Sequence, residues 1–319
     1  MSGRAQSRPH YFIKQMNSRN SALILAFLAA LIYGVSFTVA KEVMPLYVKP
    51  YAFIVLRVLG AAILFWIVGF FIAKENIERQ DYFRIFLAAI FGTALNMLTF
   101  FKGLSLTTPI NASVMMLTTP ILVLLLSTII LKEKVTFLKI LGIFVGLAGA
   151  FILIVYGQKM GPSKDALLGN FLVFVNATSY SFYLIIVKRL TDKYNPLTFV
   201  KWIYLFGLFM VLPFGFLELQ EIQWQEMSTS IYLKIGFIVV FTTFLAYLFN
   251  IFALSKLKPT TLSIFIYLQP VLASGYALLT KSDSLNMIQI VATLLIFAGI
   301  YLVTKSNTPK QLKVSKLSN

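Results

Sequence analysis

The chain has 319 residues, of which 59% are hydrophobic and only 12% are charged. Soluble domains are about 45–50% apolar and about 25% charged, so this composition excludes an ordinary soluble enzyme, and its abundance of Leu, Ile, Val and Phe excludes a disordered chain. The formal net charge of +17 does not indicate a nucleic-acid partner, because the basic residues are dispersed among short loops and tails instead of forming one stripe or arm.

Ten apolar segments follow one another along the chain, and each reaches about 20 residues. At 1.5 Å per residue, a helix of that length crosses a hydrocarbon core of about 30 Å. Strands of a membrane β-barrel would be about 10 residues long and alternate in polarity, a pattern that this chain lacks. We therefore predict an all-α, polytopic membrane protein. Its expected transmembrane helices cover residues 21–40, 51–73, 82–101, 108–131, 137–156, 166–187, 196–217, 231–254, 259–280 and 285–304.

The basic residues predict how the helices are oriented. If the N-terminus is cytoplasmic, 19 Lys and Arg residues lie in cytoplasmic connections and tails and 6 lie outside. Cytoplasmic loops of membrane proteins carry an excess of Lys and Arg, so both termini are predicted to face the cytoplasm. This orientation gives cytoplasmic tails at residues 1–20 and 306–319, and it places the acidic loop 218–226 outside.

The two halves of the chain resemble each other at a constant offset of 150 residues. The matching positions are Pro109 with Pro259, Pro120 with Pro270, and Ala148–Gly149 with Ala298–Gly299. These matches predict two five-helix units, at residues 21–160 and 161–305. Because five is an odd number, the second unit enters the membrane from the opposite side. Such an inverted repeat is typical of secondary transporters.

Pro120 and Pro270 each lie about twelve residues into a span, which places them near the middle of the bilayer. A proline there removes one backbone hydrogen bond and frees a carbonyl that needs another partner. Interrupted helices at corresponding positions of two halves indicate a binding site at the bilayer midplane. The alternative is a structural kink that only shapes the helix bundle.

Several short motifs resemble those of the EamA-type ten-helix permeases of the drug/metabolite transporter superfamily. The string Tyr33–Lys41 is similar to the family's aromatic-Gly-Ser pattern with a following Lys, and Pro50 with Arg57 resembles its Pro-to-Arg spacing into the second helix. Leu131–Thr136 resembles its Leu-Gly-Glu-Arg-Leu-Thr connection between helices 4 and 5. The resemblance covers essentially the whole membrane region.

The second half departs from these motifs, because Ile203 stands where the first half has Arg57 and residues 280–284 match the connection poorly. The resemblance implies a multi-pass carrier of small metabolites in the bacterial inner membrane, often an exporter. It also implies a central cavity formed by helices 1–4 and 6–9, with helices 5 and 10 at the periphery.

Polar side chains in the middle of the spans are the candidates for a substrate cavity. Such residues are expensive in a membrane and mark functional sites by default, although each one has helix packing as its alternative role. Together they offer neutral hydrogen-bonding groups and aromatic walls. The candidates are Tyr33, Ser36, Thr93, Asn96, Thr118, Thr119, Asn176, Ser179, Tyr180, Tyr183, Tyr247, Asn250, Tyr267 and Gln269.

Three charged residues complete the candidate site. Arg57 lies roughly 10 Å into the second span, where its guanidinium either binds a substrate carboxylate through two hydrogen bonds, pairs with Glu42, or snorkels to the interface. Lys41 and Glu42, at the outer end of the first span, are candidate gate or coupling residues. Every acidic residue lies at a span end or in a loop, so we expect facilitated transport or an indirect proton coupling through Glu42.

The chain contains no cysteine and a single histidine, His10. We therefore expect no metal site and no cofactor, and we find no activated nucleophile or carboxylate pair for an intramembrane enzyme. A channel would need a ring of charges or a filter loop, and a scaffold is a further alternative. The sequence favours a transporter that exports a small metabolite, such as an amino acid or a related zwitterionic or aromatic compound, by alternating access.

Small residues on the fifth span form a ridge that permits close helix packing. Gly142, Gly146 and Ala150 follow one another at four-residue spacing. We expect this ridge to pack within one half of the protein, with formation of a homodimer as the alternative.

Overall fold

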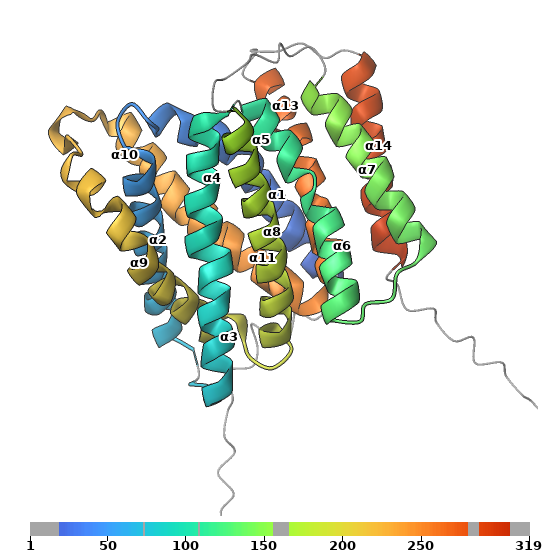
Figure 1. The fold of residues 1–319 in the computed structure, drawn as a ribbon, viewed down its shortest axis with the longest axis horizontal. Coiled ribbons are helices and arrows are strands. Elements are labelled where there is room, and N and C mark those ends of the chain that lie inside the picture. Colours follow the sequence, from blue (N-terminus) through green and yellow to red (C-terminus); the bar gives the residue numbers. More distant parts are fainter. Residues whose placement is uncertain (1–18, 73, 108, 156–165, 280–286, 307–319) are drawn as a thin grey trace, which may run out of the picture.

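The computed structural model describes residues 19–72, 74–107, 109–155, 166–279 and 287–306, and every regular element in these ranges is a helix (Figure 1). Seven helical segments are long and apolar enough to cross a membrane. Three shorter apolar segments overlap the remaining expected spans, and these are Val114–Ile130, Phe137–Ile152 and Pro259–Leu272. The protein is therefore an all-helical, polytopic membrane protein.

The first half of the chain contains α1 (Arg19–Val43), α2 (Pro50–Phe70), α3 (Arg79–Ala89), the π-helical η2 (Ile90–Ala94), α4 (Leu95–Leu106), α5 (Pro109–Met116), α6 (Thr119–Ile130) and α7 (Phe137–Val155). The second half contains α8 (Ala166–Thr191), α9 (Pro196–Gln220), the short 3₁₀-helix η3 (Trp224–Glu226), α10 (Thr229–Phe237), the π-helical η4 (Ile238–Leu245), α11 (Ala246–Lys256), α12 (Pro259–Ser263), the 3₁₀-helical η5 (Ile264–Tyr267), α13 (Leu268–Leu279) and α14 (Met287–Ser306).

Irregular backbone occurs at matching places in the two halves. The π-helical segments η2 and η4 interrupt the third span of each half, and both contain a buried threonine, Thr93 and Thr243, at the 150-residue offset. The fourth span of each half is also interrupted. In the first half, α5 ends at Met116 and α6 begins at Thr119, whereas in the second half η5 separates α12 from α13. Such interruptions often mark functional sites inside helices.

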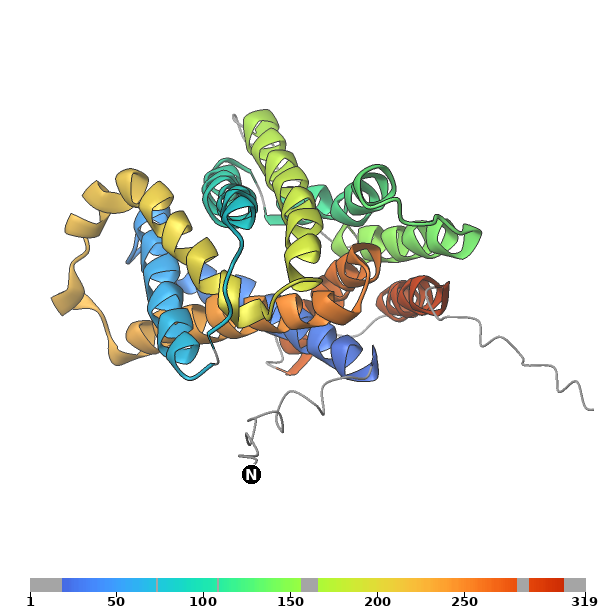
Figure 2. The ribbon, with the colours of Figure 1, turned by 90° about the horizontal axis from the view of Figure 1, so that it is seen from below.

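Helices of one half pack mainly against helices of the other half. The main pairs are α2 with α9, α4 with α8, α1 with α11 and α13, and α7 with α14. Figure 2 shows α7 and α14 side by side at one edge of the bundle, away from the centre. The core between the helices is rich in large side chains, including the fully buried Phe53, Phe65, Tyr204 and Tyr267.

The glycine ridge of α7 lies against α14. A Cβ atom on Gly142 would come within 2.7 Å of the carbonyl oxygen of Gly299, and a Cβ on Gly299 would come within 2.6 Å of that of Gly142. These distances are far below a normal contact, so the close approach requires glycine at both positions. The ridge therefore packs between the two halves and not within one half, which corrects the expectation from the sequence.

The outer surface of the bundle is apolar. Phe144, Phe171, Phe209, Leu217 and Leu233 are all more than half exposed and point away from the core. A soluble protein seldom exposes so much apolar surface, whereas lipid chains would cover it in a membrane. The arrangement leaves most polar side chains to the bundle ends and to its centre.

Candidate functional site

A cavity of about 450 Å³ lies in the centre of the bundle, between helices of both halves. Its volume falls in the range of small-molecule sites. The cavity extends toward one end of the bundle, where Met44, Pro45, Pro50 and Ser105 line it. We call this end, formed by the end of α1, the start of α2 and the end of α4, the open end, which is uppermost in Figure 1. The opposite end is called the closed end.

The structure brings many of the predicted site residues together at this cavity. Those that line it are Tyr33, Ser36, Arg57, Asn96, Asn176, Tyr180, Tyr247 and Gln269. They come from α1, α2, α4, α8, α11 and α13, so both halves contribute. Apolar side chains, including Met97, Phe100, Phe101 and Ile266, fill the gaps between them.

Arg57 is the charged residue among the described residues that line the cavity. Its side chain is almost entirely buried, and its Nε donates a hydrogen bond to Oγ1 of Thr243 at 3.0 Å. The guanidinium carbon lies 5.1 Å from the ring centroid of Phe101 and 5.9 Å from that of Phe53, which are cation–π distances. These contacts fix the orientation of the guanidinium at the cavity wall.

Three tyrosines, Tyr33, Tyr180 and Tyr247, form another wall of the cavity, and two more, Tyr183 and Tyr204, pack against them outside the lining. The ring of Tyr247 is edge-on to those of Tyr33, Tyr183 and Tyr204, at centroid distances of 6.4, 6.5 and 5.6 Å. Tyr180 stacks on Tyr183 at 5.9 Å. The rings offer flat apolar faces with hydroxyl groups at their edges, which suits an aromatic or planar ligand.

Neutral polar groups connect the helices around the cavity. Asn96 and Asn176 donate to each other's backbone carbonyl oxygens, at 3.4 and 2.7 Å. Oδ1 of Asn176 is buried and has no partner among the described residues. Oγ of Ser36 lies 2.6 Å from Oγ1 of Thr242, which joins α1 to η4. The lining therefore offers amide and hydroxyl groups to a ligand.

Other predicted site residues lie outside the cavity lining, and several support the interrupted helices. The hydroxyl of Tyr267 donates to the carbonyl of Leu117 at 3.1 Å, Ser179 donates to Phe91, and Thr118 donates to Met115. These bonds satisfy backbone carbonyls at or near the helix interruptions. The three hydroxyls therefore have the helix-packing role that the sequence analysis gave as the alternative to lining the cavity. The remaining members are the buried Thr93, Thr119 and Tyr183, and the half-buried Asn250.

The two prolines lie at the interruptions. Pro120 is in the first turn of α6 and Pro270 in the first turn of α13. Met116 and Gln269, which flank these interruptions, both line the cavity. The interrupted helices of the two halves thus meet beside the cavity, and the Tyr267–Leu117 hydrogen bond joins them at the 150-residue offset.

Glu42 pairs with Lys234 and not with Arg57. The two charged groups approach to 2.5 Å at the open end, and both are partly exposed. This contact joins α1 to α10 at the rim of the cavity. The side chain of Lys41 and residues 280–284 lie outside the described residues.

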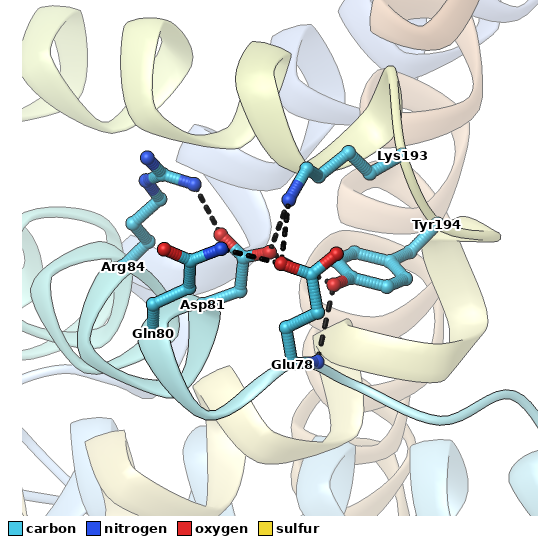
Figure 3. A network of polar contacts seen from close by, with 6 residues as sticks. All are labelled: Glu78, Gln80, Asp81, Arg84, Lys193 and Tyr194. Atoms are coloured by element: carbon cyan, nitrogen blue, oxygen red, sulfur yellow. Dashed lines mark hydrogen bonds and ion pairs between the residues drawn. The ribbon is translucent and has the colours of Figure 1, made fainter.

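The closed end carries a polar network that the sequence analysis did not identify (Figure 3). Asp81 at the start of α3 is fully buried, and it accepts hydrogen bonds from Nζ of Lys193 at 2.9 Å and from the hydroxyl of Tyr194 at 2.8 Å. Arg84 pairs with the same carboxylate, and Glu78 pairs with Lys193 at 3.1 Å. We call Glu78, Gln80, Asp81, Arg84, Lys193 and Tyr194 together the closed-end network. The network connects the first half to the α8–α9 loop of the second half.

A buried ion pair forms a second contact at the closed end. Nζ of Lys139 lies 2.6 Å from Oε1 of Glu133, and their side chains are 1% and 5% exposed. Thr260 of α12 donates to the same carboxylate oxygen. Lys139 also donates to the carbonyl of Lys134 at 2.7 Å. The α6–α7 connection of the first half is thus bound to the second half.

Comparison with known proteins places this architecture in a family. The sequence profile of the EamA-like transporter family matches residues 20–155 and again residues 167–305. An uncharacterized transporter of Archaeoglobus fulgidus is 27% identical over 282 residues, which are 88% of this chain and 98% of the relative. The uncharacterized transporter YetK of Bacillus subtilis is 23% identical over 258 residues, which are 80% of this chain and 78% of the relative.

A solved crystal structure of a protein has the same fold. It superposes with a TM-score of 0.75 at 18% sequence identity, and the match covers 91% of this chain and 98% of the other. The family profile, the relatives and the helical architecture agree over most of the sequence. The chain therefore belongs to the EamA-like transporter family.

Proposed function

We propose that this protein is a secondary transporter that moves a small metabolite, such as an amino acid or a related zwitterionic or aromatic compound, by alternating access of two inverted five-helix halves. The observation that carries the proposal is a cavity between the halves that reaches one end of the bundle. At the other end, contacts between the halves close the path, and these are the closed-end network and the Glu133–Lys139–Thr260 contact.

The second match to the family profile supports the inverted repeat, since each match spans about one predicted five-helix unit. The paired π-helices and paired interruptions also support it. Exchange between two such halves requires that contacts at one end form as those at the other end break. A channel would instead need a path through both ends at once, so the closed end favours a carrier.

The charge distribution supports a cytoplasmic closed end. Arg19 donates a hydrogen bond to the carbonyl of Thr304, so the described ends of the chain lie together. The closed end also carries Lys132, Arg189 and Lys256, whereas Glu218 and Glu221 lie at the open end. By the excess of positive charge inside, both termini face the cytoplasm and the cavity opens to the outside of a bacterial inner membrane.

Saturable flux tests the proposed function. We expect liposomes with purified protein to take up at least one member of a panel of radiolabelled amino acids and aromatic acids, with a rate that saturates. The native chain contains no cysteine, so an Ala40→Cys variant carries a single thiol in the cavity wall. A bulky maleimide should stop its flux, while the same label on a Lys102→Cys variant, outside the cavity lining, should not.

Flux that rises linearly with concentration would indicate a channel and contradict a carrier. Flux through labelled Ala40→Cys at the unlabelled rate would show that the cavity is not the transport path. Export is the proposed cellular direction, and it predicts that loss of the protein raises the intracellular level of the transported compound.

The closed-end network should be insensitive to pH near neutrality. Hydrogen bonds from Gln80 and Lys193 lower the pKa of Glu78. The stability that the ionised carboxylate gives to the network is therefore lost only as the pH falls through that lowered pKa. Hydrogen bonds to Asp81 and Glu78 raise the pKa of Lys193. The stability that the charged ammonium group gives to the network is therefore lost only as the pH rises through that raised pKa. Neither loss falls between about pH 6 and about pH 9.

Spin labels on an Arg79→Cys/Asp192→Cys variant measure this prediction, because both exposed positions flank the network. We expect the distance distribution between the labels to stay the same across that pH range. A second, longer distance that appears on going from about pH 9 to about pH 6 would show that another titrating group controls the closed end.

A further inference from the structure

The guanidinium of Arg57 is a buried positive charge without a carboxylate partner in the described part of the chain. The described ion pairs use other residues, and Glu42, the acidic residue that the sequence placed near it, pairs with Lys234. A charge in the interior of a membrane protein is costly unless it is paired or reaches water. The cation–π contacts with Phe53 and Phe101 compensate only part of that cost.

The orientation of Arg57 leaves hydrogen-bond donors for a ligand. Its Nε is used by Thr243, and no partner of its two Nη groups occurs among the described residues. Thr243 in turn donates to the carbonyl of Ile238 at 2.9 Å, which fixes the acceptor oxygen. A guanidinium held at Nε presents its Nη donors as a planar fork, the geometry that matches the two oxygens of a carboxylate.

The rest of the described cavity lining is electrically neutral. Its polar members are hydroxyl and amide groups, such as those of Tyr33, Asn96, Asn176 and Gln269, and its apolar members include Phe100 and Phe101. No described acidic side chain lines the cavity, so a ligand's ammonium group would meet no carboxylate in this wall. The charge balance therefore favours a ligand with one negative charge and an apolar or aromatic body.

We propose that Arg57 is the anchoring site for the carboxylate of the transported compound, so that the substrates are small organic acids with a flat apolar body. The carboxylate is required for binding, whereas an α-amino group is dispensable. This inference rests on the proposed transport function, and it selects within the proposed substrates those that carry a carboxylate.

Three compounds that share a phenyl ring and a two-carbon linker separate the contributions of the two charges. They are L-phenylalanine, 3-phenylpropanoate, which lacks the ammonium group, and 2-phenylethylamine, which lacks the carboxylate. Isothermal titration with the purified protein should show that L-phenylalanine binds no more tightly than 3-phenylpropanoate, because its ammonium group would meet no carboxylate in the described lining. The amine should bind at least about 30-fold more weakly, the range that a charge-assisted hydrogen bond provides. Phenyl phosphate, which carries two charges, should bind more weakly than 3-phenylpropanoate.

Variants test whether Arg57 is the anchor. Arg57→Gln should weaken binding of 3-phenylpropanoate at least about 30-fold, and Arg57→Lys should restore part of it, since lysine keeps the charge but not the fork. Arg79→Gln makes the same substitution at an exposed position of α3 and should leave binding unchanged. Elution as a single species and an unchanged melting temperature identify variants that remain folded. If Arg57→Gln does not fold, Arg57→Lys, which should bind 3-phenylpropanoate more weakly than the native protein, still tests the residue, and the comparison of ligands on the native protein tests the requirement for a carboxylate.

The outcomes distinguish this inference from the proposed function. Saturable flux of a neutral or cationic compound, without binding of any carboxylate, would overturn the inference and leave the transporter intact. Carboxylate binding that depends on Arg57, without flux, would support the inference and contradict transport. Equal binding of the amine and the acid, tighter binding of phenyl phosphate, or no binding of any compound in the set would overturn the inference.

Discussion

Replacing Glu133 with alanine is expected to destabilise the protein by about 3–5 kcal/mol, the cost of breaking a buried ion pair by removing one partner. Lys139 would keep its charge in a site where it is 1% exposed, and its remaining partner would be the carbonyl of Lys134. The variant would also lose the hydrogen bond from Thr260, which holds α12 to the α6–α7 connection. Chemical unfolding in detergent, followed by circular dichroism, measures the change in the free energy of unfolding.

A double variant separates the cost of leaving Lys139 charged without a carboxylate partner from the cost of the lost packing. Glu133→Leu/Lys139→Met replaces both charges with apolar groups of similar volume, so we expect it to recover most of the lost stability. Lys134→Ala removes an exposed charge from the same connection and should change the stability by less than about 0.5 kcal/mol. If Glu133→Ala is no more destabilising than Lys134→Ala, the pair does not hold the closed end together.

The sequence predicted the helical membrane architecture because length and hydropathy are local properties of each segment. It did not predict the Glu133–Lys139 pair, although both residues lie in or just after a motif that was identified. The pair is buried because α12 of the other half covers it, and the sequence alone does not show which elements meet. For the same reason the glycine ridge of α7 was assigned to the wrong contact.

The cavity was predicted in part. Tyr33, Asn176 and Tyr247 lie mid-span and face the centre, as their position in the sequence predicts. Tyr267 and Ser179 also lie mid-span, but their hydroxyls bind backbone carbonyls near the helix interruptions. A regular helical period does not distinguish these two cases, because a π-helical turn or a break changes which face of the helix points inward. Thr242, which lines the cavity from η4, was missed for this reason.

The partner of Glu42 could not be predicted from the charges on neighbouring spans alone. Arg57 and Glu42 have opposite charge and lie on consecutive spans, which made a pair between them a reasonable alternative. Lys234 reaches Glu42 from α10, an element of the other half almost two hundred positions away in the sequence. This contact leaves Arg57 without an acidic partner among the described residues, which no local pattern indicates.

Under the proposed alternating access, replacing Asp81 with asparagine is expected to shift the protein from the proposed outward-open state to the inward-open state. Asp81 is fully buried and binds Lys193, Tyr194 and Arg84, and all of these bonds involve its charge. Asparagine keeps the shape but weakens each bond, and a charge-assisted hydrogen bond contributes about 1.5–3 kcal/mol when buried. Because Lys193 and Arg84 are both partly exposed, we expect a shift of only about 1–2 kcal/mol, or roughly tenfold in the equilibrium constant.

Two pairs of spin labels measure this shift at both ends. In an Arg79→Cys/Asp192→Cys background, Asp81→Asn should lengthen the distance across the closed end. In a Leu46→Cys/Leu167→Cys background, which joins the first half to α8 of the second half, it should shorten the distance across the open end. All four labelled positions are exposed. Glu226→Gln, which removes an exposed negative charge at the open end, should leave both distances unchanged.

The reciprocal change separates a gate from a local stabilising contact. If the closed end lengthens while the open end keeps its distance, Asp81 holds only the α3–α8 corner together, and the two ends are not coupled. Reciprocal distances would show that the closed-end network contributes free energy to the outward-open state alone, because a contact shifts an equilibrium only by what it contributes differently to the two states. Arg57 would then face the outside until these bonds break, and a bound carboxylate would travel with the exchange of the two halves.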